Sequence, residues 1–216
     1  MKLLLTSAGI SNKSLANVLR KMVKGHIKIA FIPTAANMED GEKSWLINDL
    51  SNCKKLGDVD IVDISAMPKH IWLPRLKKAN VIVFGGGVTG YLMKCIISSG
   101  LRAELPNLLK SRVYVGISAG SIAICKTIQT SSEFFYGDEN ENSPKGLGFV
   151  NFSIRPHLNS PEFPKVRDKN LRRLAEKLDG DLYAIDDDSA VLMDGNKIKV
   201  ISEGRWKLYK KKVSKP

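Results

Sequence analysis

Short apolar runs alternate with amphipathic windows along the first half of the chain. Several of the runs are apolar at every position, as expected for strands that helices cover on both faces. The windows between them carry apolar residues at helical spacing, which indicates crossover helices. The expected strands span residues 2–5, 26–33, 59–64, 80–84 and 112–116, and the expected helices span residues 13–23, 42–56, 70–78 and 89–99. Because parallel strands need such crossovers, this order predicts an α/β fold with a mostly parallel sheet flanked by helices.

The second half of the chain has a different pattern. Residues 130–160 are rich in Ser, Gly, Asn and Pro, which predicts a long loop that ends in a strand at 149–155. The last third contains four short apolar runs separated by Asp-Gly and Glu-Gly pairs, which are typical of antiparallel hairpins. These runs span residues 182–185, 190–193, 197–201 and 205–209. We therefore predict one domain, residues 1–216, with a small antiparallel hairpin region towards its C-terminal end.

The composition is that of a globular protein. The chain has 216 residues, of which 43% are hydrophobic and 26% are charged, and this excludes intrinsic disorder. No apolar run approaches the roughly 20 residues that span a bilayer, and the opening segment MKLLLTS is too short for a signal-peptide core. We expect a cytoplasmic protein without a membrane partner. Cys53, Cys95 and Cys125 have no metal-like or disulfide-like spacing, so we expect buried thiols and no metal site.

The chain carries an excess of positive charge. There are 34 Lys and Arg against 22 Asp and Glu, a formal net charge of +12. The basic residues gather in two stretches, residues 165–177 and 205–215, and the first has leucines at helical spacing. A nucleic-acid binder would interleave aromatic residues or carry a groove-reading motif beside such a stretch. We therefore expect a solvated basic face and no nucleic-acid partner.

One short motif points to nucleophilic chemistry. Residues 116–120 read Gly-Ile-Ser-Ala-Gly, which matches G-x-S-x-G, a sharp strand-to-helix turn that exposes a serine hydroxyl above a sheet. An ordinary glycine-rich turn could have the same residues. However, an apolar strand precedes Ser118 and a helical window follows it, as the motif requires. This context makes Ser118 the candidate nucleophile.

A serine hydroxyl needs a neighbouring base at neutral pH. The chain has three histidines. His26 and His70 lie near a strand start and in a crossover, whereas His157 follows Pro156 at the end of a predicted strand. Ligands of open α/β sheets bind outside the carboxyl ends of the strands, where Ser118 and His157 would both emerge. His157 is therefore the candidate base.

The third member of a triad is an acid that orients the imidazole. Between the serine and the histidine the chain offers Glu133, Asp138, Glu139 and Glu141. We prefer Glu133 because the phenylalanines at 134 and 135 suggest a packed position, whereas the other three lie in a polar run.

A triple glycine, Gly85 to Gly87, follows the predicted strand at 80–84. Together with Gly90 it spells G-x-G-x-x-G, the dinucleotide fingerprint. We reject that interpretation, because the fingerprint belongs to a first βαβ unit with an acid about 20 residues further on, where this chain has Lys110. A glycine turn also suits an oxyanion hole. The N–H of Gly86 or Gly87 and that of Ala119 are the candidate donors.

Taken in this order, the motifs resemble a known family. A strand, GGGxT, a helix, GxSAG, an acid and I-x-P-H are similar to the peptidase E family of aspartyl dipeptidases, and the resemblance runs from Lys2 to about Met193. It implies a class I glutamine amidotransferase-like, flavodoxin-like three-layer fold. It also implies a serine peptidase without cofactor or metal, with a short peptide as substrate. Ser118, His157 and Glu133 match the family's nucleophile, base and acid, and the glycine turn and Ala119 match its oxyanion hole.

The chain departs from the family pattern at two positions. The best-known members have Asp where Glu133 stands and Asn where Arg155 stands. In the family, selectivity for an N-terminal aspartate is assigned to an arginine after the histidine. Arg167 is the closest match here and Arg155 is a second candidate, since either could pair with a substrate carboxylate.

We therefore expect an acyl-enzyme hydrolase of dipeptides or short peptides with an N-terminal Asp, as a monomer or homodimer. Two alternatives stay open. The fold could be a non-catalytic module that binds an acidic partner or RNA through its basic surface, or a cyanophycinase-like hydrolase of an aspartyl-containing polymer. Amidotransferase chemistry is disfavoured because it uses a cysteine at the elbow, and Cys125 lies seven residues beyond Ser118.

Overall fold

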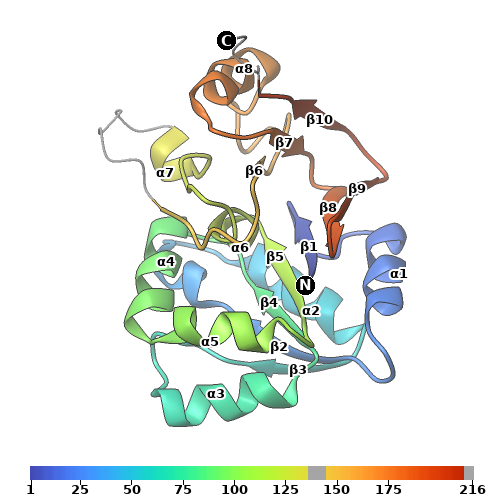
Figure 1. Ribbon diagram of the computed structural model, residues 1–216, viewed down its shortest axis with the longest axis vertical. Coiled ribbons are helices and arrows are strands. Elements are labelled where there is room, and N and C mark those ends of the chain that lie inside the picture. The colour runs from blue at the N-terminus through green and yellow to red at the C-terminus, as the bar shows by residue number, and fades with distance from the viewer. Residues whose placement is uncertain (136–144, 212–216) are drawn as a thin grey trace.

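The computed structural model describes residues 1–135 and 145–211. Its main sheet has seven strands in the order β3-β2-β4-β5-β1-β8-β9 (Figure 1). Neighbours from β3 to β1 are parallel, and β8 and β9 complete the sheet in antiparallel pairing. These strands are β1 Lys2–Thr6, β2 Lys28–Ile32, β3 Asp58–Ile61, β4 Val81–Phe84, β5 Val113–Ile117, β8 Ser189–Asp194 and β9 Lys197–Ser202. The predicted mostly parallel α/β fold is confirmed.

Helices cover both faces of the main sheet. Leu3 and Leu5 of β1 belong to a core with α3, α4, α5 and α6, whereas Leu4 between them belongs to a core with α1 and α2. This is the alternation that a strand covered on both faces requires. The helical elements are α1 Lys13–Met22, the 3₁₀ turn η1 Thr34–Met38, α2 Ser44–Lys54, α3 Lys69–Lys78, α4 Thr89–Ser98, α5 Leu101–Leu108, α6 Ala119–Ala123, α7 Ser132–Phe135 and α8 Asp168–Lys177.

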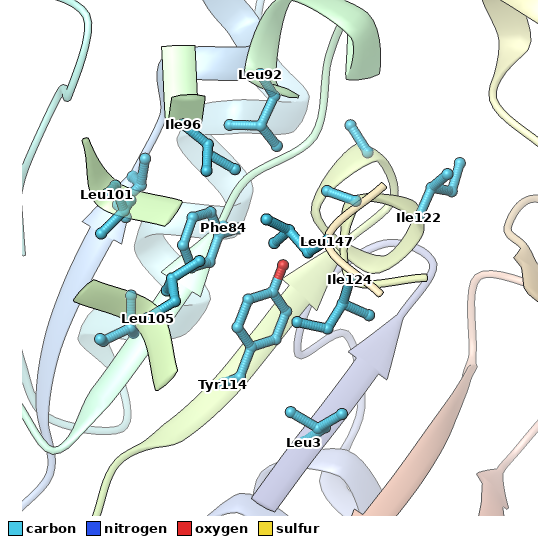
Figure 2. Packing of buried hydrophobic residues seen from close by; sticks show 14 of the residues in the cluster. Leu3, Phe84, Leu92, Ile96, Leu101, Leu105, Tyr114, Ile122, Ile124 and Leu147 are labelled. Carbon is cyan, nitrogen blue, oxygen red and sulfur yellow. The ribbon is translucent and has the colours of Figure 1, made fainter. Parts of the chain in front are cut away.

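The first core reaches the short helix that follows β5. The rings of Phe84 and Tyr114 stack with centroids 4.7 Å apart, and the leucines and isoleucines of α4 and α5 surround them (Figure 2). The Tyr114 hydroxyl donates a hydrogen bond to the carbonyl of Gly120 at 2.6 Å. The core and this hydrogen bond therefore fix the position of α6.

Two local features differ from the sequence expectation. Helix α5 was not among the predicted helices, since it follows α4 after the left-handed Gly100 and contains Pro106, and both residues are signals for the end of a helix. The strand expected at 149–155 is shorter, because only Ser153–Arg155 forms β6. The apolar residues before it pack into the core as irregular chain.

A second sheet has three strands in the order β10-β7-β6 and lies above the main sheet in Figure 1. Its remaining strands are β7 Leu182–Ile185 and β10 Trp206–Tyr209. Strand β6 is parallel to β7, and β10 is antiparallel to β7. Leu171 and Leu178 from α8 and its C-cap pack against β7 in a separate small core. The predicted antiparallel pairs of the C-terminal third are present, but β8 and β9 join the main sheet.

All three cysteines are buried free thiols, as predicted. No helix within residues 1–135 and 145–211 is long and apolar enough to cross a membrane.

Asp49 is a buried acid on α2. Asp49 is only 7% exposed. Its carboxyl lies close to Gly9, since a Cβ atom added to that glycine would be 2.5 Å from Asp49 Oδ1. Burial raises the pKa of the Asp49 carboxyl to about 7, because a low-dielectric site disfavours the charged form. The folded state therefore favours the protonated acid, whereas the unfolded chain ionises near pH 4.

This buried acid should make stability depend on pH. The stabilising effect of protonated Asp49 is present below about pH 4 and is lost as the pH rises to about 7. The Asp49→Asn variant stays neutral at every pH. Its free energy of unfolding, relative to that of the wild type, should therefore rise by up to about 4 kcal/mol between pH 4 and pH 8, because burial moves the Asp49 pKa from near 4 to about 7. Urea unfolding at several pH values measures this gain. A difference that is constant with pH would contradict it.

Candidate active site

Ser118 lies on a strained turn between β5 and α6. Its φ is +46° and its ψ is −104°, an unusual conformation for a residue with a side chain. The backbone N–H of Ser118 donates to the carbonyl of Thr6 at 3.1 Å, which ties the turn to the end of β1. A Cβ atom at Gly120 would lie 2.1 Å from the carbonyl oxygen of Phe84. The glycine lets α6 pack against β4, and this packing holds the partly exposed serine above the sheet.

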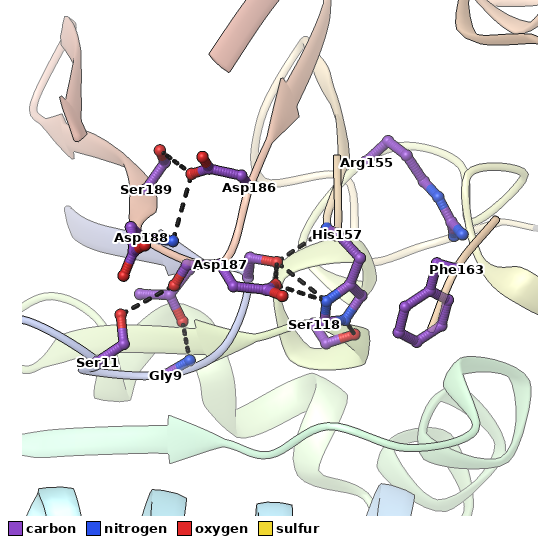
Figure 3. Close-up of polar contacts among 12 residues, drawn as sticks. Gly9, Ser11, Ser118, Arg155, His157, Phe163, Asp186, Asp187, Asp188 and Ser189 are labelled. Atoms are coloured by element: carbon purple, nitrogen blue, oxygen red, sulfur yellow. Dashed lines mark hydrogen bonds and ion pairs between the residues drawn. The ribbon is translucent and has the colours of Figure 1, made fainter. Parts of the chain in front are cut away.

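His157 reaches this serine from the second sheet. It follows β6 and Pro156, and its own φ is +63°. Its Nε2 lies 3.0 Å from Ser118 Oγ, and its Nδ1 lies 2.7 Å from Asp187 Oδ1 (Figure 3). The ring of Phe163 stacks on the imidazole with centroids 4.1 Å apart. Only 14% of the histidine side chain is exposed, so packing and hydrogen bonds fix its orientation.

Asp187 and Ser7 hold the imidazole from behind. The Ser7 hydroxyl donates to Asp187 Oδ1 at 2.6 Å and accepts the backbone N–H of His157 at 2.8 Å. Burial of the Asp187 carboxyl opposes its ionisation, but hydrogen bonds from His157 and Ser7 favour the carboxylate and leave its pKa below the usual value. A carboxylate at Nδ1 selects the tautomer that carries its proton there. The lone pair of Nε2 then faces the Ser118 hydroxyl.

The structure corrects the predicted acid. The Glu133 carboxylate accepts the backbone N–H groups of Thr89 at 3.3 Å and Gly90 at 2.7 Å, at the start of α4. A carboxylate is favourable there because it meets unpaired amides at the positive end of the helix. Both ring nitrogens of His157 already have partners in Ser118 and Asp187. The carboxylate that contacts the imidazole is therefore that of Asp187 and not that of Glu133.

The three other acids that were considered, Asp138, Glu139 and Glu141, lie outside the described residues. Asp187 follows His157 in the chain and so lies outside the interval between the serine and the histidine in which the acid is expected. A signal was available. Residues 186–188 are three consecutive aspartates directly after the predicted strand at 182–185, and ligand-binding residues gather at the carboxyl ends of such strands.

The glycine turn after β4 borders the serine. A Cβ atom at Gly86 would lie 3.6 Å from Ser118 Cβ. Gly87 has a φ of +125°, and a Cβ atom there would lie 2.3 Å from the carbonyl oxygen of Ala35, so only glycine fits. Neither amide of this pair donates a hydrogen bond within residues 1–135 and 145–211. Ala119 is the first residue of α6, where a helical N–H has no partner within its own helix.

The two predicted substrate arginines are both engaged by the protein. Arg155 is 1% exposed, donates to the carbonyl of Thr130 at 2.6 Å and lies over the ring of Phe135. Arg167 donates to three backbone carbonyls, those of Ser160, Phe163 and Val166, at 3.1 Å each. The guanidinium of Arg167 thereby fixes the segment that carries Phe163. Each arginine therefore stabilises the fold through hydrogen bonds to backbone carbonyls.

In the described part of the chain, no three His, Cys, Asp or Glu side chains gather as a metal site would require. The groups that do gather are a hydroxyl, an imidazole, a carboxylate and a turn with free backbone amides. Such an arrangement can activate an alcohol as a nucleophile and stabilise a negative oxygen beside it.

The chain resembles known proteins in sequence. The model of peptidase family S51 matches residues 3–201. A peptidase E of Nostoc sp. is 30% identical over 135 residues, which cover 56% of this chain and 55% of that protein. A peptidase E of Salmonella arizonae is 33% identical over 107 residues, which cover 47% of this chain and 46% of that protein. The match thus spans about half the length of these curated relatives.

A solved structure shows the same fold over a greater length. A protein of Listeria monocytogenes superposes with a TM-score of 0.76 at 22% sequence identity. The superposition covers 94% of this chain and 98% of that one. The likeness therefore extends over nearly the whole of both chains.

Proposed function

The chain belongs to peptidase family S51, and on that premise we propose that it is a serine peptidase that cleaves short peptides. Its membership confirms the resemblance to peptidase E seen in the motifs. One observation carries the proposal of serine chemistry. Ser118, His157 and Asp187 form a continuous hydrogen-bonded chain with distances of 3.0 and 2.7 Å.

The proposed reaction starts at the Ser118 hydroxyl. As Oγ attacks the peptide carbonyl, His157 Nε2 accepts the hydroxyl proton, and Asp187 stabilises the resulting imidazolium through Nδ1–H. The carbonyl oxygen becomes an oxyanion, which the N–H groups of Gly86 or Gly87 and of Ala119 receive. His157 then gives its proton to the leaving amine as the C–N bond breaks. An ester to Ser118 remains.

A water molecule resolves this ester by the same steps. His157 accepts a proton from the water as its oxygen attacks the acyl carbon, and the second oxyanion meets the same amides. When the bond to Ser118 breaks, the imidazolium returns the proton to Oγ. The products are two shorter peptides or amino acids, and the enzyme is restored.

The preference for an N-terminal aspartate stays a prediction. It depended on Arg167 or Arg155 pairing with the aspartate carboxylate. Both guanidiniums bind backbone carbonyls of the protein itself, and Arg155 is buried. A substrate aspartate side chain therefore needs a different partner.

Labelling with a fluorophosphonate tests the serine mechanism. An activated Ser118 Oγ should displace fluoride from the phosphorus atom and leave a covalent adduct that peptide mapping places at residue 118. The Ser118→Ala variant should stay unlabelled, and Ser44→Ala, which removes an exposed hydroxyl on α2, should be labelled as fast as the wild type. A wild-type protein that resists the probe would contradict the proposal and favour the non-catalytic module.

A further inference from the structure

Trp45 lies beside the reacting atoms. It is in the first turn of α2, far from Ser118 in the sequence. A Cβ atom at Gly86 would lie 3.4 Å from Cζ3 of the Trp45 ring and 3.6 Å from Ser118 Cβ. The indole and the nucleophile thus border the same glycine, whose neighbourhood supplies the oxyanion donors. A substrate carbonyl held by those donors would place the adjacent side chain near the indole.

The Trp45 ring is available to a ligand. The residue is 37% exposed, although tryptophan tends to bury most of its large surface. A single exposed aromatic residue is ordinary on a protein surface. Its position beside Gly86 of the catalytic turn makes this one unusual. Phe163 stacks on His157 at 4.1 Å, so a second aromatic ring also borders the reacting atoms.

The charges near the site disfavour an acidic substrate side chain. Arg155 and Arg167 are occupied by backbone carbonyls. Glu42 is exposed and precedes Trp45 by three residues, which limits the separation of their Cα atoms to about 11 Å. Lys43, the N-cap residue of α2, precedes Trp45 by two residues, and its ammonium donates to the carbonyl of Gly41 at 3.3 Å. A substrate carboxylate placed against the indole would lose water beside Glu42, and this is unfavourable.

We propose that Trp45 forms the wall of an apolar subsite, so that the enzyme favours peptides with a large apolar side chain next to the scissile bond over peptides with an acidic one. The proposal rests on the proposed serine peptidase function and names its substrate class. An apolar side chain would cover the exposed part of the indole and remove both surfaces from water. An alanine side chain is too short to use this wall.

Dipeptide hydrolysis tests the subsite. The panel is X-Ala and Ala-X, with X as Ala, Leu, Phe or Asp, and the measured quantity is kcat/KM for the wild type and for each variant. The wild type should favour Leu or Phe over Asp in one of the two positions. Trp45→Ala should lower kcat/KM for that apolar peptide by about 10- to 100-fold, the usual range for one apolar contact. It should change hydrolysis of Ala-Ala by less than about threefold.

Three further variants separate a subsite from a structural role. Trp45→Phe should restore most of the apolar preference, and Trp45→Gln should behave like Trp45→Ala. Ile47→Ala is the matched control, because Ile47 lies on the same helix and is 65% exposed, and it should change nothing. Fluorophosphonate labelling of Ser118 should proceed at the wild-type rate in all of them, since that small probe does not need the subsite.

The outcomes distinguish the two proposals. If no peptide shows hydrolysis that depends on Ser118, the proposed function fails. If hydrolysis occurs but Asp is favoured over Leu and Phe in both positions, the apolar subsite is overturned and the serine mechanism stands. An equal loss for every peptide in Trp45→Ala, or a loss of labelling, would show a structural role only and would also overturn the subsite.

Discussion

Replacing Ser118 with alanine is expected to lower kcat by roughly 10⁶-fold, the scale on which serine hydrolases lose activity without their nucleophile. The change removes the only atom that can form the acyl-enzyme, and His157 is left without a proton to accept. The variant should fold like the wild type, because the backbone N–H of Ser118 still donates to Thr6 and the strained turn is held by α6. Hydrolysis of the best dipeptide and thermal melting measure the two effects.

A second replacement in the same protein checks that the residues act as a unit. Adding His157→Ala to Ser118→Ala should cost little more than the single change, because each removal alone already disables the hydroxyl and imidazole pair. Residual hydrolysis should come from binding and from the backbone amides of the glycine turn. If Ser118→Ala kept more than about a tenth of wild-type kcat/KM, another nucleophile would be needed.

The parts that the sequence predicts well are those determined by local pattern. Strands β1, β2, β4 and β5 are apolar on both faces, so their runs identify a covered parallel sheet. The elbow at Ser118 is also local, since its small residues fit a turn that closes within five positions. His157 followed from a general rule about the carboxyl ends of strands. That rule needs no knowledge of side-chain contacts.

The parts that the sequence does not predict depend on which segments meet in space. Asp187 reaches His157 because β6 and β7 pair as parallel neighbours, and no local pattern specifies that pairing. Glu133 was preferred for its aromatic neighbours, yet its carboxylate binds the start of α4. Ser7 had no signal beyond its place at the end of a strand. Each of these roles depends on contacts between residues distant in the chain.

The arginines show the same limit for charge. A guanidinium in a sequence looks available to a substrate, but folding can engage it first. Arg167 binds three backbone carbonyls of the loop that carries Phe163, and Arg155 is enclosed with Phe135 and Thr130. An exposed indole, by contrast, has few polar atoms that the protein itself must hydrogen-bond. This is why the position of Trp45 beside Gly86 emerges only from the structure.

Replacing Asp187 with asparagine is expected to lower kcat by about 10⁴-fold with little change in the fold. The Ser7 hydroxyl and His157 Nδ1 both meet the same oxygen, Asp187 Oδ1, at 2.6 and 2.7 Å. With the asparagine nitrogen in that place, the Ser7 hydroxyl would lose its acceptor, and the amide would donate to His157 Nδ1 and move the ring proton to Nε2. That nitrogen could then no longer accept the Ser118 proton, and the imidazolium would lose its carboxylate. Steady-state kinetics and thermal melting measure the result.

Glu133→Gln is the matched control, because it makes the same carboxylate-to-amide change at the acid that the sequence favoured. The glutamine carbonyl oxygen can still accept the N–H of Gly90, which now donates to Glu133 at 2.7 Å, so α4 should stay capped and activity should stay within a few-fold of wild type. A comparison of the two variants thus shows whether Asp187 or Glu133 orients the imidazole. A loss of about 10⁴-fold in Glu133→Gln with an active Asp187→Asn would return the role to Glu133 and require His157 to turn away from Asp187 during the reaction.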